Sequence, residues 1–256
     1  MSATITTLPS VTALPDDQSK PKAGDGLVSN LNSPEAKKQA YETARSVGPA
    51  IRDIRKGLIS VADALITFDS KNFKNQEGNT LSLGKEWKPL IQEFETTLQF
   101  SLAQAIDTTV VMKTITAVLG DVAGIDAKDL ADELAQFLEQ LRSKEASALE
   151  SEQRITLVNQ GLNDILTRED LVTVGTWLDE SKKIVASVSS QILIIANFWK
   201  MIHLDMLYLR AALSSQVEGT PVITKYFFKK LDVVKEICHH ITLLLDTYVE
   251  QTNIAN

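Results

Sequence analysis

The chain has 256 residues, of which 44% are hydrophobic, so it can bury a large core as one elongated domain or as two. Its formal net charge of -7 argues against a general affinity for nucleic acid, because binding phosphates needs a concentrated basic surface. Few glycines (11) and prolines (7) are typical of a helical protein, and a single cysteine excludes an intramolecular disulfide and a cysteine-based metal site.

The first 32 residues differ in composition from the rest of the chain. They are rich in Ser, Thr, Pro, Asp and Gly, and they hold too little apolar surface to offset the entropy of ordering them. We therefore expect a flexible tail over 1–32 and an elongated helical bundle over 33–256. Residues 1–15 lack a basic start and a continuous apolar segment, so we expect a protein that is cytoplasmic as synthesised or released without a classical signal peptide. No window of about 18 uncharged apolar residues predicts a constitutive membrane span.

The first helix is predicted from Ser33, a capping residue followed by Pro34, to about Lys71. Its apolar residues alternate at steps of four and three, and Gly48 and Pro49 within it predict a kink. Residues 72–84 lack any period and predict a loop.

A second helix is predicted to begin between Leu83 and Trp87, and it leads into the most hydrophobic part of the chain. Residues 108–125 are mainly β-branched or small, and Lys113 and Asp121 are their only charges. β-Branched side chains lower helical propensity without forbidding a helix. This segment is either an element that later meets lipid or the buried middle of a bundle helix.

A third helix is predicted after Asp126, a plausible cap. Lys144 and Ser151 occupy two positions of its apolar seam, which favours a partly exposed or extended helix. The register then slips near Thr167 and Asp170, which match a capping box, and we expect a turn or kink there rather than one long helix with a stutter. The other seam positions are Leu130, Leu134, Phe137, Leu141, Ala148, Ile155, Val158, Leu162 and Ile165.

The strongest pattern in the chain is a seven-residue repeat from Leu171 to Leu213. It predicts a helix from about Thr167 to Ser215, on the order of 70 Å long at ~1.5 Å per residue. A rod of this length needs antiparallel partners of similar length. Its seam residues are Leu178, Val185, Val188, Ile192, Ile195, Trp199, Ile202, Met206, Leu209 and Leu213.

After a break at 218–221, a last helix carries a broad apolar stripe that can pack on more than one neighbour. We interpret Cys238 as a small buried side chain and the four lysines of this helix as a solvated face: Lys225, Lys229, Lys230 and Lys235. The fold class is therefore all-α: an elongated bundle of about five helices, with long heptad-patterned antiparallel helices.

No catalytic motif accompanies this architecture. Phosphate-binding loops, the nucleophile elbow and the zinc-protease pair are all missing from the sequence. His203 and Asp205 lie two residues apart and face different sides of a helix, so they cannot chelate one ion together. We therefore expect no enzyme activity, no cofactor and no metal site.

The late part of the chain resembles the cytolysin A superfamily of α-helical pore-forming toxins, which includes hemolysin E, the α-xenorhabdolysins and the Bacillus tripartite enterotoxin components. The likeness lies in Gln191–Leu213, where an aromatic pair is followed by apolar, acidic and leucine positions, and in the closing helix 225–252. This chain is shorter than most members, and its Lys113 and Asp121 are charges in the segment that corresponds to the hydrophobic tongue.

The resemblance implies a soluble helical rod that rearranges on a membrane, inserts a hydrophobic tongue and assembles into a ring, alone as a homo-oligomer or with a second toxin component. Membrane lipid would then be its partner, and it would be membrane-associated when active. The alternative is a soluble coiled-coil interaction or scaffold module that pairs through an exposed seam over 130–165. The insertion candidates are Val110, Val111, Met112, Ile115, Val118, Leu119, Val122 and Ile125.

Overall fold

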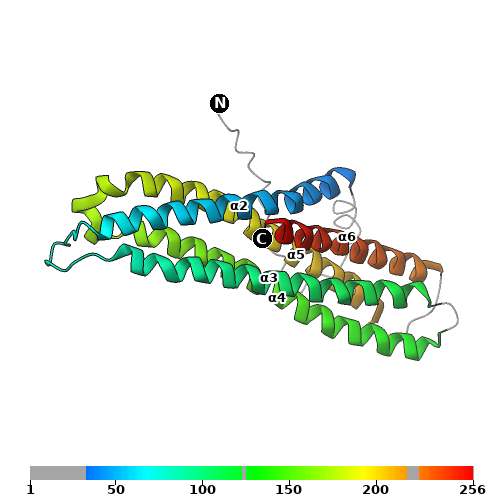
Figure 1. Cartoon of the computed structure of the whole chain (residues 1–256). Coiled ribbons are helices and arrows are strands. Elements are labelled where there is room, and N and C mark those ends of the chain that lie inside the picture. The colour runs from blue at the N-terminus through cyan, green and yellow to red at the C-terminus, as the bar shows by residue number, and fades with distance from the viewer. Residues whose placement is uncertain (1–32, 123–124, 218–224, 256) are drawn as a thin grey trace.

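A computed structural model describes residues 33–122, 125–217 and 225–255. In this part of the chain it holds five α-helices and one 3-10 helix and no strand beyond an isolated bridge between Lys74 and Thr80. The predicted tail 1–32 and the predicted break at 218–221 lie outside the described residues. The all-α class is therefore confirmed, and Figure 1 shows the helices side by side in an elongated bundle.

The first two helices form an antiparallel hairpin. Helix α2, Pro34–Asp69, begins where its cap predicts, since the Ser33 side chain accepts a hydrogen bond from the Ala36 amide at 3.1 Å. It continues as one helix through Pro49. After the predicted loop, α3 spans Leu83–Gly120.

The second hairpin joins α4 and α5 through a corner. Helix α4, Ala127–Thr167, is capped by Asp126, whose side chain accepts from the Lys128 amide at 2.8 Å. Arg168 is extended, the 3-10 helix η1 covers Glu169–Leu178, and α5 spans Asp179–Val217. The expected turn at this point is thus confirmed.

Two details of the prediction at this corner are wrong. The helix predicted from about Thr167 to Ser215 begins as α5 at Asp179, so its 39 residues give a length of about 58 Å instead of about 70 Å. The capping box does not form: the Thr167 hydroxyl donates to the Asn163 carbonyl at 3.0 Å, and Asp170 instead accepts two hydrogen bonds from Arg168. The arginine competes successfully for the carboxylate because a bidentate, charge-assisted pair is stronger than a cap.

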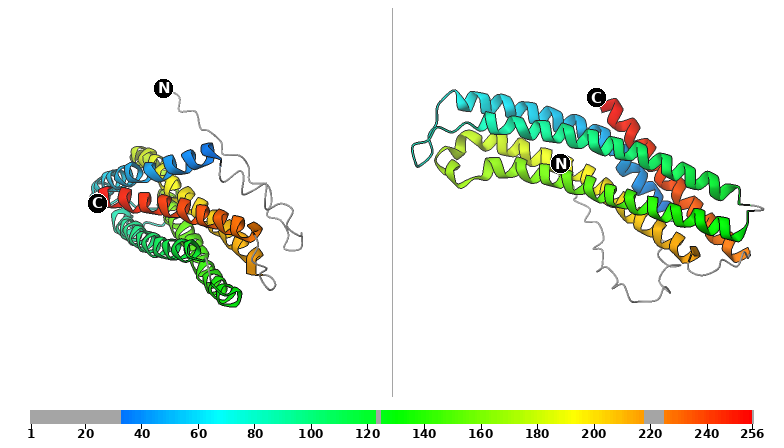
Figure 2. Two further views of the ribbon diagram at one scale, coloured as in Figure 1. Left: turned by 90° about the vertical axis from the view of Figure 1, so that its right-hand side faces the viewer. Right: turned by 90° about the horizontal axis from the view of Figure 1, so that it is seen from below.

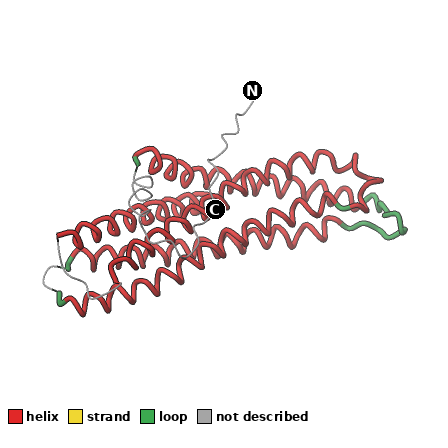
Figure 3. Tube along the Cα trace, turned by 180° about the vertical axis from the view of Figure 1, so that it is seen from behind, coloured by secondary structure: helices red, strands yellow, loops and turns green. Residues whose placement is uncertain are grey.

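Helix α6, Lys225–Ala255, covers only one half of the bundle. It starts at the end where α3 meets α4 and finishes near the middle, as Figures 1 and 2 show. It packs against α2, α3 and α5. The bundle therefore has four helices on the side of the α2–α3 loop and five where α6 joins them. Figure 3 shows that the described loops lie at the two ends of the bundle.

The core follows the seams. All ten seam positions from Leu178, at the end of η1, to Leu213 of α5 are buried, and so are the apolar seam positions of α4 from Leu130 to Ile165. Of the two alternatives for α4, partly exposed or extended, exposure of the seam at Ser151 is wrong, because Ser151 is 0% exposed and its hydroxyl donates a hydrogen bond to the Ser147 carbonyl at 2.9 Å. Lys144 lies along the helix interface and forms an ion pair with Asp107 of α3, so its charged head is partnered rather than solvated.

Two glycines of α2 allow close helix contacts. A Cβ at Gly57 would lie 2.3 Å from Cγ2 of Val188 on α5, and one at Gly48 would lie 3.0 Å from the backbone carbonyl oxygen of Gln251 on α6. Any larger residue at either position would force the helices apart.

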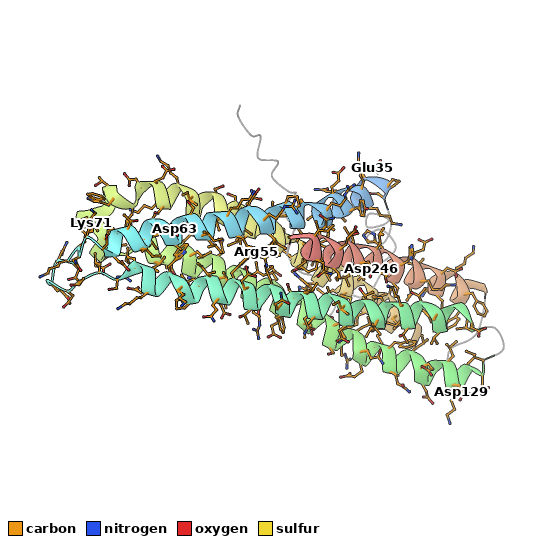
Figure 4. All side chains as sticks on the ribbon, viewed as in Figure 1. Glu35, Arg55, Asp63, Lys71, Asp129 and Asp246 are labelled. Atoms are coloured by element: carbon orange, nitrogen blue, oxygen red, sulfur yellow. The ribbon has the colours of Figure 1, made fainter. Side chains whose placement is uncertain are left out.

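Arg55 ties three helices together where the bundle changes from five helices to four (Figure 4). Its guanidinium forms a bidentate pair with Glu95 of α3, with N–O distances of 2.8 and 2.6 Å. It also donates to the carbonyl of Ala255 at 2.7 Å, in the last turn of α6. Positive charge is favourable at a helix C-terminus, so Arg55 fixes the end of α6 against α2 and α3.

Candidate membrane-insertion element

The hydrophobic segment predicted from the sequence forms the second half of α3 and the start of the α3–α4 connection. Residues 108–120 are helical, Asp121 caps the helix, and residues 123–124 lie outside the described part. Met112, Ile115 and Leu119 are buried, whereas Val111, Val118, Val122 and Ile125 are half-buried and Val110 is 58% exposed. The structure therefore brings three of the eight insertion candidates into the core and leaves five in partial or full contact with solvent.

The solvent side of this half of α3 mixes exposed apolar residues, Ile106 and Val110, with the exposed polar residues Asp107, Lys113 and Thr114. Ile106 and Val110 are one turn apart and both exposed, at 49% and 58%. A surface helix of a globular protein normally carries polar residues on the solvent side. The exposed Ile106 and Val110 are the feature of α3 that core packing does not explain.

Two described helical segments are long and apolar enough to cross a membrane: Leu83–Gly120, which is α3, and Val174–Ser214, which includes most of α5. Length and composition alone do not separate a membrane helix from a core helix, so burial decides. In α5, 50% of the most apolar window is buried, while in α3 only 33% is buried. A smaller share of the residues in the most apolar window is therefore buried in α3 than in α5.

Helix α6 holds this half of α3 in place. Lys113 pairs with Asp246 of α6 at 3.0 Å, and both side chains are at least half exposed, so the pair contributes little stability. The buried Cys238 of α6 lies close to Thr116 of α3; burial raises the pKa of the Cys238 thiol to about 12, and a hydrogen bond from Thr116 opposes that shift. Asp107 also pairs with Lys144 of α4.

A buried aromatic cluster anchors α6 to α3 and α5 near the middle of the bundle. The Tyr248 hydroxyl and the Ser101 hydroxyl share a hydrogen bond of 2.6 Å, and burial raises the pKa of Tyr248. Phe198 stacks on the Tyr248 ring with centroids 4.7 Å apart, and Trp199 meets it edge-on at 5.4 Å. The aromatic pair of α5 is therefore a core contact, as its seam position predicts.

Asp205, considered from the sequence only as a metal ligand with His203, is a buried carboxylate. It lies on α5, one heptad after Phe198, and is 4% exposed. Its Oδ2 atom has no hydrogen-bond partner among the described residues, and burial raises its pKa to about 7. The available signal was its position between Ile202, Met206 and Leu209, which places it beside the apolar seam.

The other polar residues considered from the sequence do not converge. Among the described residues, no group of three or more His, Cys, Asp or Glu side chains is arranged to hold a metal ion. His203 is half-buried on α5, and His239 and His240 lie on α6.

No family model, curated protein or solved structure matches this chain.

Proposed function

We propose that this protein is an α-pore-forming-toxin-like protein, which inserts the second half of α3 into a target membrane and oligomerises into a pore. One observation carries the proposal. α3 is apolar and long enough to cross a membrane, yet only 33% of its most apolar window is buried in the bundle. Membrane lipid is a solvent in which both the buried and the exposed apolar residues of this helix would be covered.

The surroundings of α3 suggest how such an element is released. A helix keeps its backbone hydrogen bonds when it moves into lipid, so residues 108–120 need not refold. The exposed pair between Lys113 and Asp246 contributes little to holding α3 against α6. A lysine at the bilayer centre costs about 2.5–3.5 kcal/mol, so in the inserted form we expect Lys113 to face a lumen or the interface.

The alternative function, an interaction module that pairs through the α4 seam, has less support. The apolar seam residues between Leu130 and Ile165 are buried within this chain. They would reach a partner only if α4 separated from the bundle. A homo-oligomer, or an assembly with a second component, fits the proposed pore without requiring a free seam in the soluble form.

Dye release from liposomes tests the proposal with a matched pair of variants. Val110 on α3 and Ile59 on α2 are 58% and 59% exposed, so an aspartate at either site is solvated in the soluble bundle. Val110→Asp would place a charge in lipid, at about 2.5 kcal/mol or more at the bilayer centre. We expect the wild-type protein and Ile59→Asp to release the dye equally, and Val110→Asp to release none. Both variants should be equally stable in urea.

Repeating the assay with an extract of the source cells tests whether release requires a second component. Release from neither preparation, or equal release by the wild type and Val110→Asp, would contradict the proposal. Rings seen by electron microscopy on the wild-type liposomes, and missing with Val110→Asp, would support assembly as well as insertion.

A further inference from the structure

A groove with a volume of about 470 Å³ lies between the first turns of α2, the second half of α3 and the middle of α6. Its basic groups are Lys37 of α2 and Lys235, His239 and His240 of α6. Thr116 of α3 also lines it, so the groove adjoins the candidate insertion element.

The remaining walls are mainly apolar. Tyr41, Leu243 and Leu244 contribute to them, and both Tyr41 and Leu243 are partly open to solvent, at 37% and 47% exposure. The groove thus combines cationic groups with apolar surface, which is the chemistry that recognises an anionic amphiphile.

The charged groups around the groove give it a net positive charge once a histidine is protonated. Lys235 pairs with Asp232 at 2.6 Å, and Glu236, exposed on the same helix, also lines the groove. With neutral histidines, the lysines Lys37 and Lys235 therefore balance these two acids. On the α3 side, Thr116 carries no charge, and Lys113 is already paired with Asp246.

His240 reports the sign of the field inside the groove. Burial lowers its pKa, and the positive charges of Lys37 and His239 lower it further. A bound anion would offset the positive charges of Lys37 and His239 and raise the pKa of His240. Anion binding and protonation of His240 would therefore strengthen each other.

We infer that this groove binds the phosphate of an anionic lipid headgroup, with the apolar wall receiving the start of the acyl chains. This inference rests on the proposed membrane function and names its docking site. A chain with a net charge of -7 is repelled by an anionic surface as a whole, so contact needs a local cationic site. Docking here would place the five-helix end, with residues 108–120, against the membrane.

Flotation with liposomes tests the docking site separately from pore formation. The liposomes are phosphatidylcholine alone or phosphatidylcholine with phosphatidic acid, and the variants are Lys37→Gln, in the groove, and Lys56→Gln, an exposed residue of α2 outside it. Removing one charge-assisted phosphate contact corresponds to about a tenfold loss of affinity. We expect that loss with Lys37→Gln on the anionic liposomes, and wild-type binding with Lys56→Gln.

The pH dependence provides a second readout. Wild-type binding to anionic liposomes should increase as the pH falls from 7.5 to 5.5, because protonated His240 adds positive charge to the groove. His240→Gln should reduce this increase. Equal affinity of the wild type and Lys37→Gln, or an unchanged pH dependence in His240→Gln, would overturn the inference.

Inorganic phosphate separates a lipid from a free anion. NMR of the histidine rings should show a higher His240 pKa with anionic liposomes or with a short-chain phosphatidic acid. A shift with inorganic phosphate alone, without competition by liposomes, would overturn the lipid assignment.

The two proposals can fail independently. Binding through Lys37 without dye release under any condition would refute the pore and support the docking site. Equal release from neutral and anionic liposomes, unaffected by Lys37→Gln, would refute the docking site and support the pore.

Discussion

Asp205 makes the stability of the bundle depend on pH in a direction that can be calculated. Burial raises its pKa from 3.8 to about 7 in the folded protein. Below about pH 4 the carboxyl is protonated in both states and carries no penalty. Between pH 4 and 7 the unfolded chain loses the proton while the folded chain retains it, so the free energy of unfolding falls as the pH rises. Above pH 7 the full penalty applies.

The magnitude follows from the difference between the two pKa values. About three pKa units at ~1.36 kcal/mol each give about 4 kcal/mol in total. Between pH 5 and pH 8, the range in which urea unfolding is convenient, linkage assigns about 2–3 kcal/mol of that fall to Asp205. This is a large part of the net stability of a typical domain, about 5–15 kcal/mol.

Asp205→Asn removes the ionisation and keeps the shape. We expect its free energy of unfolding to fall between pH 5 and pH 8 by about 2–3 kcal/mol less than that of the wild type. An unpaired buried amide has a cost of its own, so the slope with pH is the diagnostic rather than the absolute value. Tryptophan fluorescence during urea titration at several pH values measures it.

Asp53→Asn is the control, because Asp53 is exposed on α2. It should follow the wild-type slope. Parallel curves for the wild type and Asp205→Asn would show that the Asp205 carboxylate is solvated or partnered in solution, and they would refute the reasoning.

Three further predictions concern the contacts between helices. Gly57→Ala should destabilise the bundle by about 1–3 kcal/mol in urea, because the new methyl group would lie 2.3 Å from Cγ2 of Val188. Tyr248→Phe should cost about 1 kcal/mol, because it removes the 2.6 Å hydrogen bond to the Ser101 hydroxyl while Ser101 keeps its bond to the Leu98 carbonyl and the ring stack remains. Cys238, buried and with a pKa of about 12, should react with iodoacetamide at pH 8 only as fast as the bundle opens.

Each of these has an internal comparison. Gly120→Ala places its methyl group in open space and should leave the urea midpoint nearly unchanged. Ser101→Ala combined with Tyr248→Phe should cost less than the sum of the two single changes, because no buried hydroxyl is left without its partner. Alkylation of Cys238 at the rate of a free thiol in the native protein would show that α6 is not held as the structure describes.

Local sequence information determined much of the helical architecture. The caps at Ser33 and Asp126 and the heptad seam of α5 depend on residues a few positions apart, so they could be predicted without the tertiary structure. The corner near Arg168 was predicted from the slip in register, but its 3-10 geometry and the ion pair with Asp170 were not. A pattern of apolar spacing specifies a helix face, and it does not specify how polar groups choose their partners.

Tertiary structure decided which polar positions are buried and which apolar surface stays exposed. Ser151, Lys144 and Asp205 share an ordinary polar appearance in the sequence, yet all three lie at interfaces between long helices. The partial exposure of the second half of α3 and the groove beside it arise from how α2, α3 and α6 pack against one another. These features depend on contacts between residues far apart in the chain, such as Ser101 with Tyr248, and helical periodicity holds no information about such contacts.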